Sequence, residues 1–594
     1  MRETCVDKFL ERARVCANDN AYFIKKNDQW QPSTWKEFGE DTTNFAKGLM
    51  SLGHEKGECV GVLGYNRPEW IMACIGTQMV AGVSAGVYTS CSAEEVAYVL
   101  HHSEAKVAVV ENAKRWREQV KPVLNQLPHL KAVILMDNSE EVNDNMVMGF
   151  DKLLELGKKQ DDASFKTRLS QIDPNGLATL IYTSGTTGPP KAVMLSHKSI
   201  AWTVDSTVNL IHVGKGDVIL SYLPLAHIAE QMFSIYAPIC CGATLYFAES
   251  MEKLPENLKE VQPTVFFGVP RVYEKFYAKV KVKIDSAKGT KKLLVTWAQK
   301  VAKEVWERKH QGKELSTQLK VQYAMTQKLI FSKLKPLLGL GRARICITGA
   351  APISNDILNF FMGLDVPIYE VYGQSEDCGP TSINIPGAAK VGSVGKPLPG
   401  VKVKIADDGE ILVKGPNVFM GYMKDEKATN EAMNDGWLFS GDIGHLDQDG
   451  YLKITDRKKD ILITAGGKNI APQNLEGMLK QIPLVSLAVV VGDRKKYLSA
   501  LLTPNEENLA EAAKKMGIED RSISNMVKQE QILLKLKEEI DKMNKKLAPV
   551  EQIKKFDFLP RDFSVETGEL TPTMKIKRKV VNERYSKNIA NLYQ

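Results

Sequence analysis

Short apolar runs rich in β-branched residues alternate with helical patterns through the first part of this chain of 594 residues. Three such runs cover residues 58–64, 105–111 and 131–137, and polar residues follow each of them. Runs of this length that alternate with amphipathic helical patterns are typical of largely parallel sheets covered by helices. The sequence therefore predicts an α/β fold of layered subdomains.

Strands joined by tight Asp-Gly turns replace this alternation later in the chain. They include "GEILVKG" at 409–415 and "LDQDGYLKITD" at 446–456, and both patterns indicate short antiparallel strands. Helical patterns return at 474–481 and again at 527–546. We therefore predict a second, smaller α+β unit that begins near Asp456.

The composition is that of an ordinary globular protein, with 43% hydrophobic and 25% charged residues. No segment approaches the ~18 consecutive apolar residues of a membrane-spanning helix, so we expect a chain that is soluble or only associated with a membrane surface. Charges interrupt the apolar residues of the first ten positions, which favours a cytoplasmic protein over a secreted one. The nine cysteines are scattered without a CxxC pair, and they indicate neither a zinc site nor a disulfide framework.

A stretch rich in glycine and hydroxyl groups, "YTSGTTGPPKAVMLSH" at 182–197, resembles an anion-binding loop. It does not fit the common phosphate loop, in which a glycine directly precedes a lysine that opens a helix. Here two prolines separate Gly188 from Lys191, and the residues after Lys191 alternate as a strand does, with Ser196 as the cap of the next helix. We therefore predict a loop between two strands, which disfavours a kinase or a P-loop ATPase.

Such a loop can present hydroxyl groups, backbone N–H groups and the ammonium group of Lys191 to an anion. The alternative interpretation is a polar surface hairpin without a ligand. The hydroxyl groups belong to Thr183, Ser184, Thr186 and Thr187.

The loop is the first of eight motifs that span nearly the whole chain. The other seven are "LPLAHIAE" at 223–230, "FFGVPRVYEK" at 266–275, "ITGAAPIS" at 347–354, "YGQSE" at 372–376, "GWLFSGDIG" at 436–444, "DRKKDILITAGGKNIAP" at 456–472 and "LTPTMKIKR" at 570–578. In this order they resemble the signatures of the adenylate-forming superfamily. Within it, "FGVPRVYEK", "ITAGGKNIAP" and "FSVETGELTPTMKIKR" are similar to the long-chain and very-long-chain fatty acid enzymes, particularly the bubblegum type.

The resemblance implies a large N-terminal domain over residues 1–456, built of layered α/β subdomains with a small β-barrel-like part. It also implies a small, mobile α+β C-terminal domain over residues 461–594. The small domain is expected to swing about a hinge at residues 457–460, so that one pocket serves two reactions.

Acyl-CoA synthetases of this superfamily join a carboxylic acid to ATP, which gives acyl-AMP and pyrophosphate, and then pass the acyl group to coenzyme A. By resemblance we expect a long-chain fatty acid–CoA ligase that uses ATP, Mg²⁺ and coenzyme A. Two alternatives stay open. One is a fatty acyl-AMP ligase that loads a carrier protein, and the other is a catalytically silent acyl- or nucleotide-binding protein.

The resemblance also assigns residues to ATP and coenzyme A. Tyr372 would stack on adenine, Ser375 would bond to the α-phosphate, and Asp442 would accept hydrogen bonds from the ribose hydroxyls. Glu376 would ligate Mg²⁺, together with Thr183, since a lone carboxylate beside phosphates needs a metal ion. The complete set expected to bind these two molecules is Thr183, Ser184, Gly185, Thr186, Thr187, Gly188, Lys191, Gly349, Ala350, Ala351, Tyr372, Gly373, Ser375, Asp442, Arg457, Gly466 and Gly467.

The catalytic residues expected from the resemblance are Lys575, Glu376 and His227. Spacing alone leaves Lys575, Lys577 and Lys579 equivalent, and only the resemblance selects Lys575 as the cation that neutralises charge at the α-phosphate. His227 is either a residue of the acyl tunnel or a packed core histidine, and Arg271 in "VPRVYEK" is either functional or structural.

Two positions depart from the usual family pattern. Ala192 replaces the glycine that usually follows the loop lysine, and Ser440 replaces the threonine that usually precedes Gly441 and Asp442. Neither change removes a charge that the chemistry needs, so an active enzyme is still expected.

A basic insert at about 271–344 holds 19 Lys and Arg against 5 Asp and Glu, although the whole chain has a net charge of only +8. Within it, Leu293, Leu294, Trp297 and Val301 follow a helical spacing. The insert is a solvated face, a surface that attracts the phosphates of coenzyme A, or a contact with an anionic membrane, and we favour the membrane. No nucleic-acid motif accompanies the charge, so nucleic-acid binding is not expected.

Overall fold

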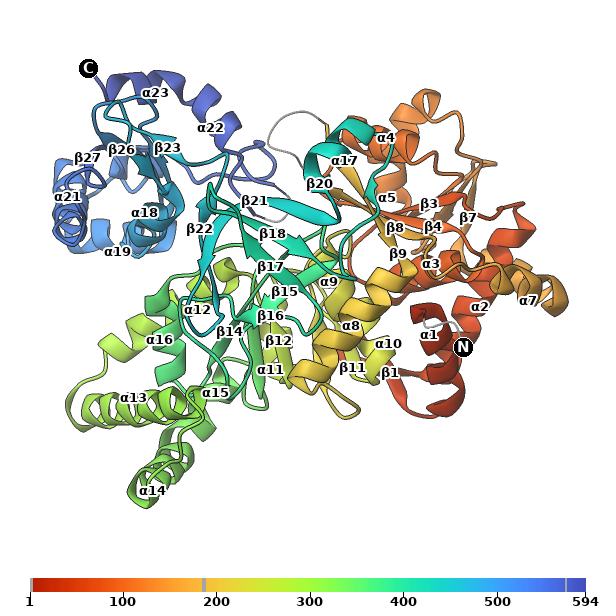
Figure 1. The fold of residues 1–594 in the computed structure, drawn as a ribbon, viewed down its shortest axis with the longest axis horizontal. Coiled ribbons are helices and arrows are strands. Elements are labelled where there is room, and N and C mark those ends of the chain that lie inside the picture. The colour runs from red at the N-terminus through yellow and green to blue at the C-terminus, as the bar shows by residue number, and fades with distance from the viewer. Residues whose placement is uncertain (1–3, 184–188, 572–573) are drawn as a thin grey trace.

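The computed structural model describes residues 4–183, 189–571 and 574–594, and it has the mixed α/β architecture that the sequence predicts (Figure 1). Its first sheet has the strand order β19-β9-β8-β4-β3-β5-β6-β7. The three runs predicted as strands are β3, β5 and β6, which pair in parallel. The strands are β3 (Cys59–Leu63), β4 (Val83–Val87), β5 (Val107–Val110), β6 (Ala132–Leu135), β7 (Val147–Gly149), β8 (Leu177–Thr183), β9 (Lys191–Ser196) and β19 (Gly421–Tyr422).

Helices cover this sheet on its apolar faces because β-branched side chains point to both sides of its central strands. Strands β3, β4, β5 and β6 are buried along their whole length. The helices packed in this region include α2 (Trp35–Ser51), α3 (Pro68–Met79), α4 (Ala93–His102) and α6 (Phe150–Lys158).

A second sheet of nine strands has the order β16-β15-β14-β13-β12-β10-β11-β1-β2, with a parallel centre and antiparallel pairs at both edges. The carboxyl ends of its central strands carry the motifs at 223–230, 347–354 and 372–376. Ligands of such sheets bind beyond the carboxyl ends of the strands, so this edge is the expected place for a site. The strands are β1 (Asn20–Lys26), β2 (Gln29–Thr34), β10 (Val218–Ser221), β11 (Thr244–Phe247), β12 (Val265–Phe267), β13 (Ile345–Thr348), β14 (Ile368–Gln374), β15 (Gly379–Ile383) and β16 (Lys396–Pro397).

The part expected to resemble a barrel is an open antiparallel sheet. Its strand order is β17-β18-β21-β20, with β22 paired to β21, and the described strands do not close into a barrel. The predicted Asp-Gly hairpin is confirmed, because β21 and β22 pair antiparallel across it. The strands are β17 (Lys402–Ile405), β18 (Glu410–Lys414), β20 (Met433–Asn434), β21 (Trp437–Leu446) and β22 (Leu452–Arg457).

The small C-terminal unit has its own sheet and its own apolar cores, as the α+β pattern predicts. In Figure 1 it lies at the upper left, in blue, above α12 (Pro270–Asp285) and α16 (Asn355–Gly363). The exact boundaries, the hinge at 457–460 and the mobility of this unit stay predictions. Its elements include β23 (Leu462–Ile463), β24 (Asn469–Ile470), β25 (Val485–Val491), β26 (Leu498–Pro504), β27 (Ile553–Phe558), α18 (Pro472–Leu479), α19 (Glu506–Lys515), α21 (Glu530–Asn544), α22 (Arg578–Arg584) and α23 (Ser586–Asn591).

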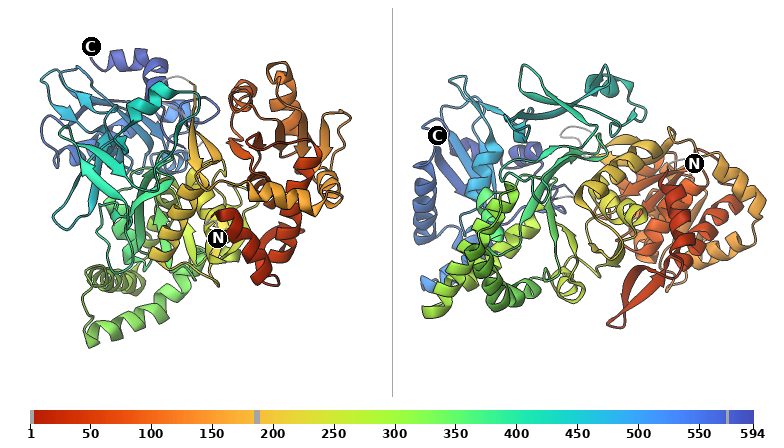
Figure 2. Two further views of the ribbon diagram at one scale, coloured as in Figure 1. Left: turned by 45° about the vertical axis from the view of Figure 1, so that its right-hand side comes forward. Right: turned by 60° about the horizontal axis from the view of Figure 1, so that its bottom comes forward.

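The basic insert forms α12 (Pro270–Asp285), α13 (Gly289–His310) and α14 (Thr317–Thr326), and α13 and α14 project from the body in both Figure 1 and Figure 2. The predicted apolar stripe of α13 is buried only in its second half, where Val301 is 5% exposed. Leu293 and Leu294, in the first half, are 71% and 45% exposed because that part of the helix extends beyond its neighbours. Among the helices in the described ranges, none combines the length and the apolar character needed to cross a membrane.

Candidate functional site

The loop at 182–197 joins two antiparallel strands, as predicted, because β8 ends at Thr183 and β9 begins at Lys191. The Thr183 hydroxyl donates to the carbonyl oxygen of Lys191 at 3.4 Å. The Ser196 side chain accepts from the backbone N–H of Ser199 and caps α8 (His197–Ile211), also as predicted. The other expected loop residues lie outside the described ranges: Ser184, Gly185, Thr186, Thr187 and Gly188.

Lys191 and Glu376 meet around a tyrosine that the sequence analysis did not identify. The Tyr422 hydroxyl donates to Glu376 Oε1 at 2.8 Å, and Lys191 Nζ lies 4.7 Å from the centre of the Tyr422 ring. Glu376 follows β14, whereas Tyr422 ends β19. The predicted phosphate ligand and the predicted metal ligand thus contact the same tyrosine, although they come from different sheets.

Asp442 is buried and both of its carboxylate oxygens are held. Tyr372 OH and Gln374 Nε2 donate to Oδ2 at 2.8 and 2.6 Å, and Arg457 Nε lies 3.2 Å from Oδ1. Register brings Asp442 and Arg457 opposite each other on β21 and β22. Gln374 belongs to the quoted motif "YGQSE" but received no role, since nothing local to the motif shows which way its amide points.

Serine in place of the usual threonine at position 440 keeps a side-chain hydrogen bond to the backbone of Asp442. Ser440 Oγ accepts from the backbone N–H of Asp442 at 3.1 Å. The hydroxyl that both residue types share makes this contact, so the departure from the family pattern is conservative here. The other departure, Ala192, is buried in β9.

The segment expected to border adenine follows β13 directly, as predicted. A side-chain carbon on Gly349 would lie 2.6 Å from Val371 Cγ1 and 2.8 Å from its carbonyl oxygen, so packing against β14 already requires glycine. Ala350 has φ = 67°, in the left-handed region, and Ala351 follows it. Tyr372, Gly373 and Ser375 lie at the end of the neighbouring strand, and Ser375 is buried.

Lys575 reaches this group of residues from the small domain. The side chains that influence its pKa, besides burial, are Arg457, Asp442 and Glu376, all from the larger part of the chain. Burial and Arg457 lower the pKa of Lys575 to about 8, against the opposing effect of the two carboxylates. Four of the residues predicted in separate motifs, Glu376, Asp442, Arg457 and Lys575, are therefore brought together in space.

His227 borders the same group. Its Nδ1 accepts from the backbone N–H of Ala229 at 3.2 Å, which leaves the proton of the neutral ring on Nε2. Burial, with a contribution from Lys575, lowers the pKa of His227 to about 3, so the ring is neutral at physiological pH. A neutral histidine beside Lys575 can donate one hydrogen bond through Nε2 without adding a charge.

Arg271 contacts the small domain across the junction of the two parts. Its guanidinium donates to the side-chain and carbonyl oxygens of Ser486 at 2.7 and 3.2 Å. Three residues later, Glu274 pairs with Lys480 at 2.8 Å. These contacts hold the small domain in the orientation that places Lys575 in the site, which is a structural role for Arg271.

Gly466 and Gly467 do not join this group. They lie in an exposed turn between β23 and β24, in which Gly467 N–H donates to the carbonyl oxygen of Thr464 at 2.9 Å. The backbone of this hairpin bonds to residues 493–495, which also belong to the small domain.

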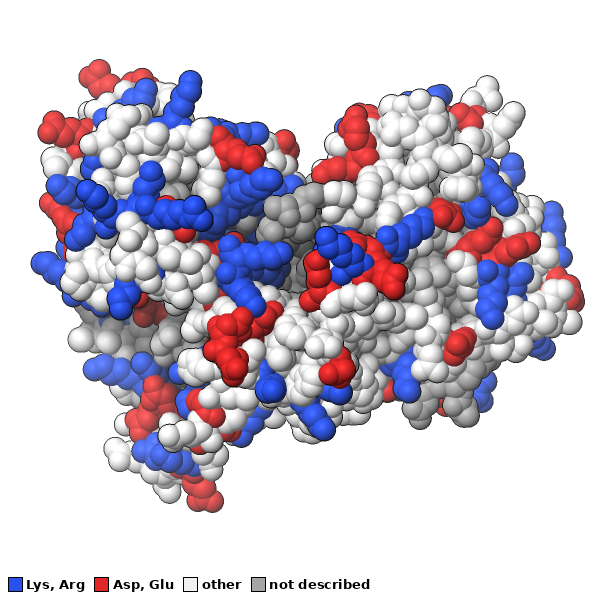
Figure 3. Space-filling model, turned by 45° about the horizontal axis from the view of Figure 1, so that its top comes forward, with Lys and Arg blue, Asp and Glu red and all other residues white. Residues whose placement is uncertain are grey.

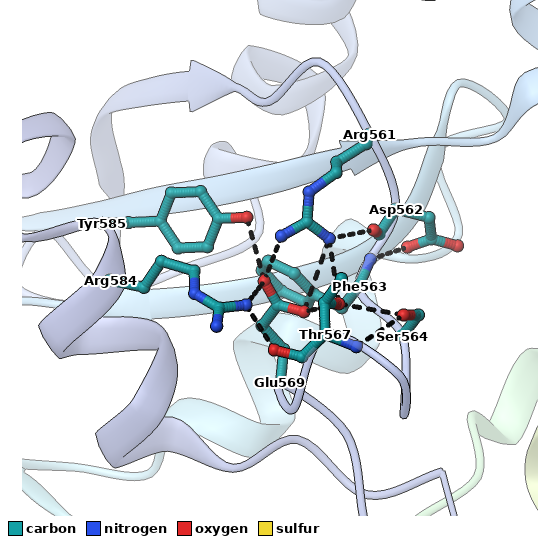
Figure 4. A network of polar contacts seen from close by, with 8 residues as sticks. All are labelled: Arg561, Asp562, Phe563, Ser564, Thr567, Glu569, Arg584 and Tyr585. Atoms are coloured by element: carbon teal, nitrogen blue, oxygen red, sulfur yellow. Dashed lines mark hydrogen bonds and ion pairs between the residues drawn. The ribbon is translucent and has the colours of Figure 1, made fainter.

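A network of charges supports the segment that carries Lys575 (Figure 4). The buried Glu569 accepts from Arg561, from Arg584 at 2.7 Å and from Tyr585 at 3.2 Å. Burial favours the protonated carboxyl, but Arg561, Thr567 and Arg584 outweigh it and hold the pKa of Glu569 at about 2. Glu569 lies in the stretch "FSVETGELTPTMKIKR", where no local pattern predicts its role because its partners lie up to sixteen residues away.

The backbone connects this network to Lys575. Lys577 N–H donates to the carbonyl oxygen of Glu569 at 2.7 Å. The backbone N–H of Thr571 donates to the Lys575 carbonyl oxygen at 2.7 Å, and the Lys575 N–H donates to Thr571 Oγ1 at 3.0 Å. On the surface, Figure 3 shows a notch between the small domain and the N-terminal part, with Lys and Arg gathered on the small-domain side. A cationic wall of this kind attracts anionic ligands.

Family models match both parts of the chain. The model described as "AMP-binding enzyme" matches residues 9–423, and "AMP-binding enzyme C-terminal domain" matches residues 459–594. Among solved structures, the anthranilate CoA ligase AuaEII in complex with anthranoyl-AMP superposes with a TM-score of 0.75 at 19% identity, covering 99% of this chain and 98% of that chain. The adenylation domain of a carboxylate reductase from Mycobacterium chelonae gives 0.79 at 19% identity, covering 99% and 91%.

Curated relatives are similar over almost the whole chain. The long-chain-fatty-acid–CoA ligase ACSBG2 of Xenopus laevis is 40% identical, over 99% of this chain and 83% of the relative. The human protein of the same name is 37% identical, over 99% and 92%, and ACSBG1 of Rattus norvegicus is 34% identical, over 99% and 85%. The chain therefore belongs to the AMP-binding, adenylate-forming enzymes, in the bubblegum-type branch of long-chain-fatty-acid–CoA ligases.

Proposed function

We propose that this protein is an AMP-forming long-chain fatty acid–CoA ligase. In the first step a fatty acid carboxylate attacks the α-phosphate of ATP and releases pyrophosphate, and in the second step the thiol of coenzyme A attacks the acyl-AMP and releases AMP. The observation that carries the proposal is the convergence of Lys575 with Glu376, Asp442 and Arg457. The two cations can bind the negative phosphates of ATP and stabilise the charge that develops during the reaction, and the two carboxylates can bind the ribose hydroxyls and a metal ion.

Each large-domain residue has a role that fits its surroundings. Lys191 binds the phosphates that leave, and Arg457 binds oxygens near the ribose. Asp442, held by Tyr372 and Gln374, is oriented to accept from ribose hydroxyls. Lys575 neutralises charge where the carboxylate meets the α-phosphate.

The residues of the site suit a magnesium ion that binds together with ATP. Mg²⁺ usually takes one or two carboxylates and completes its shell with phosphates and water. Within the described residues no cluster of three or more His, Cys, Asp or Glu is suited to a metal ion, whereas Glu376 offers one carboxylate beside the phosphate-binding loop. Bound there, the ion would neutralise phosphate charge, and Glu376 and Thr183 are the residues that would hold it.

The second step uses coenzyme A, for which Gly466 and Gly467 are proposed to form part of the entrance. Their exposed position away from Lys575 fits a mechanism in which the small domain rotates about residues 457–460 between the steps. The expected effect of the rotation is to withdraw Lys575 and to bring the glycine turn to the acyl-AMP.

We further propose that the enzyme works in the cytoplasm, in peripheral contact with anionic membranes through the basic insert. Support comes from exposed apolar side chains among its lysines, a combination that suits lipid headgroups and the acyl boundary beneath them. The most exposed of them are Val282, Leu293, Val321, Leu329 and Leu337.

Vesicle sedimentation tests this contact. Anionic vesicles should bind wild-type protein at low salt and should bind Leu293→Glu less, whereas Leu534→Glu, a control at a leucine 54% exposed in the small domain, should bind as wild type does. Equal and negligible binding of wild type to anionic and neutral vesicles would contradict the membrane proposal.

Product analysis tests the enzymatic function. The purified full chain should release pyrophosphate only with both fatty acid and ATP, and AMP with thioester should appear when coenzyme A is added. Transfer only to a carrier-protein phosphopantetheine would instead indicate an acyl-AMP ligase, and absence of pyrophosphate release would indicate a silent binding protein. A panel of acids from medium to very long chain defines the preferred substrate, and a preference for acetate or an amino acid would contradict the long-chain assignment.

A further inference from the structure

Tyr422 occupies a place that none of the eight motifs covers. Its hydroxyl is bonded to one oxygen of Glu376 at 2.8 Å, and its ring faces Lys191 Nζ at 4.7 Å. It therefore contacts both the carboxylate proposed to hold Mg²⁺ and the ammonium proposed to hold phosphate.

The backbone around Tyr422 fixes the ring in this place. Strand β19 adds antiparallel to β9, which pairs Tyr422 with Val193, two residues after Lys191. Thr429 Oγ1 accepts from the Tyr422 backbone N–H at 2.9 Å. The preceding Gly421 has φ = 131°, which other residues rarely adopt, so the turn into Tyr422 depends on glycine.

A second contact ties the same segment to the metal-ligand turn. The backbone N–H of Phe419 donates to the carbonyl oxygen of Glu376 at 2.9 Å, and the Phe419 ring packs edge-on against Tyr422 at 5.0 Å. The segment 419–422 thus bonds to Glu376 through both backbone and side chain. A residue that only filled space would not need a hydroxyl aimed at a half-buried carboxylate.

We infer that Tyr422 is a positioning residue. Through its two contacts it holds the Glu376 carboxylate and the Lys191 ammonium in place for the magnesium ion and the nucleotide. The phenol donates to Oε1, so the Glu376 carboxylate that would hold magnesium keeps a fixed orientation. The negative face of the ring attracts the Lys191 ammonium that would bind the phosphates. This inference rests on the proposed ligase function. It adds a link between the phosphate loop and the metal ligand that neither motif contains.

The test compares Tyr422→Phe, which keeps the ring, with Tyr422→Leu, which loses both contacts. The readouts are binding of a non-hydrolysable ATP analogue at a series of Mg²⁺ concentrations and fatty-acid-dependent pyrophosphate release. Because a hydrogen bond to a charged group is lost, Tyr422→Phe should need about tenfold more Mg²⁺ for the same binding, with kcat at saturating Mg²⁺ close to wild type. Tyr422→Leu should in addition bind the analogue about fivefold more weakly at saturating Mg²⁺.

A double-mutant cycle sharpens the result. In a Glu376→Gln background the Phe substitution should leave the Mg²⁺ requirement unchanged, because the contact it removes is already altered. Tyr497→Phe is the matched control, since that hydroxyl donates to the Leu592 carbonyl oxygen at 2.9 Å within the small domain, and it should behave as wild type.

An unchanged Mg²⁺ requirement in Tyr422→Phe would overturn the inference, and a lowered melting temperature with unchanged Mg²⁺ dependence would show that Tyr422 is only structural. Wild-type protein that releases no pyrophosphate would instead contradict the proposed function. Analogue binding would then still decide the role of Tyr422, because that measurement needs no turnover.

Discussion

The large-domain half of the site and the small-domain half are built differently. Asp442 lies within β21 and Glu376 follows β14, and hydrogen bonds from other side chains hold their carboxylates. Lys575 lies in a turn of the small domain whose hydrogen bonds involve its backbone and Thr571, while its side chain extends among charges of the other half. We propose from this difference that the large-domain half binds the nucleotide through both reactions and that the small-domain half takes part in only one of them.

The largest effect should follow the loss of the Lys575 ammonium. We expect Lys575→Ala to slow acyl-CoA formation from fatty acid by about 100- to 1,000-fold, because the charge that stabilises the adenylation transition state is gone. Steady-state thioester formation measures this. Lys579→Ala is the matched control, since Lys579 is 59% exposed and four residues away, and comparable loss in that variant would contradict the assignment.

Loss of the Asp442 carboxylate should raise the KM for ATP by about 10- to 100-fold. The magnitude is that of hydrogen bonds to a charged group, and the loss also leaves Arg457 without its partner. Initial rates at varied ATP concentrations measure it. An Asp442→Ala variant with an unchanged KM for ATP would show that this carboxylate does not face the nucleotide.

The pH dependence of adenylation should report Lys575. Its lowered pKa of about 8, against an ordinary 10.5, means that the free protein carries the cation below pH 8 and loses it above. The kcat/KM for pyrophosphate release should therefore fall about tenfold per pH unit above pH 8. Lys575→Arg should abolish this decline because guanidinium stays protonated, and a decline that persisted in the arginine variant would assign it to another group.

A smaller effect should follow disruption of the network behind Lys575. We expect Glu569→Gln to destabilise the small domain by about 2 kcal/mol, the scale of hydrogen bonds from charged groups, and to slow adenylation about tenfold by misplacing the Lys575 turn. Thermal unfolding and pyrophosphate release measure the two effects. Unfolding at the wild-type temperature together with wild-type adenylation would show that the network does not support the turn.

The sequence predicted the parts of the site that local patterns encode. The strands on both sides of the phosphate loop, the Ser196 cap and the β21–β22 hairpin follow from alternation, capping and turn residues, and all three are confirmed. Spacing alone could not distinguish Lys575, Lys577 and Lys579 as the catalytic lysine, and only the resemblance to a family selected Lys575.

What the sequence did not predict depends on contacts between distant segments. Tyr422 meets Glu376 46 residues away, and Gln374 meets Asp442 68 residues away, so neither pairing leaves a local pattern. The helical spacing of Leu293 and Leu294 predicted a helix, but it does not show whether a neighbour covers their side chains, and both are exposed in α13. The barrel-like part is an open sheet, because strand patterns do not fix closure.

The two half-reactions, measured separately in the same variants, test the central claim most directly. With chemically prepared acyl-AMP and coenzyme A, Lys575→Ala should form thioester at nearly the wild-type rate while its adenylation is lost, whereas Asp442→Ala should be slow in both steps. Equal loss of both steps in Lys575→Ala would contradict an account in which the large domain binds the nucleotide throughout and the small-domain lysine acts only in the first reaction.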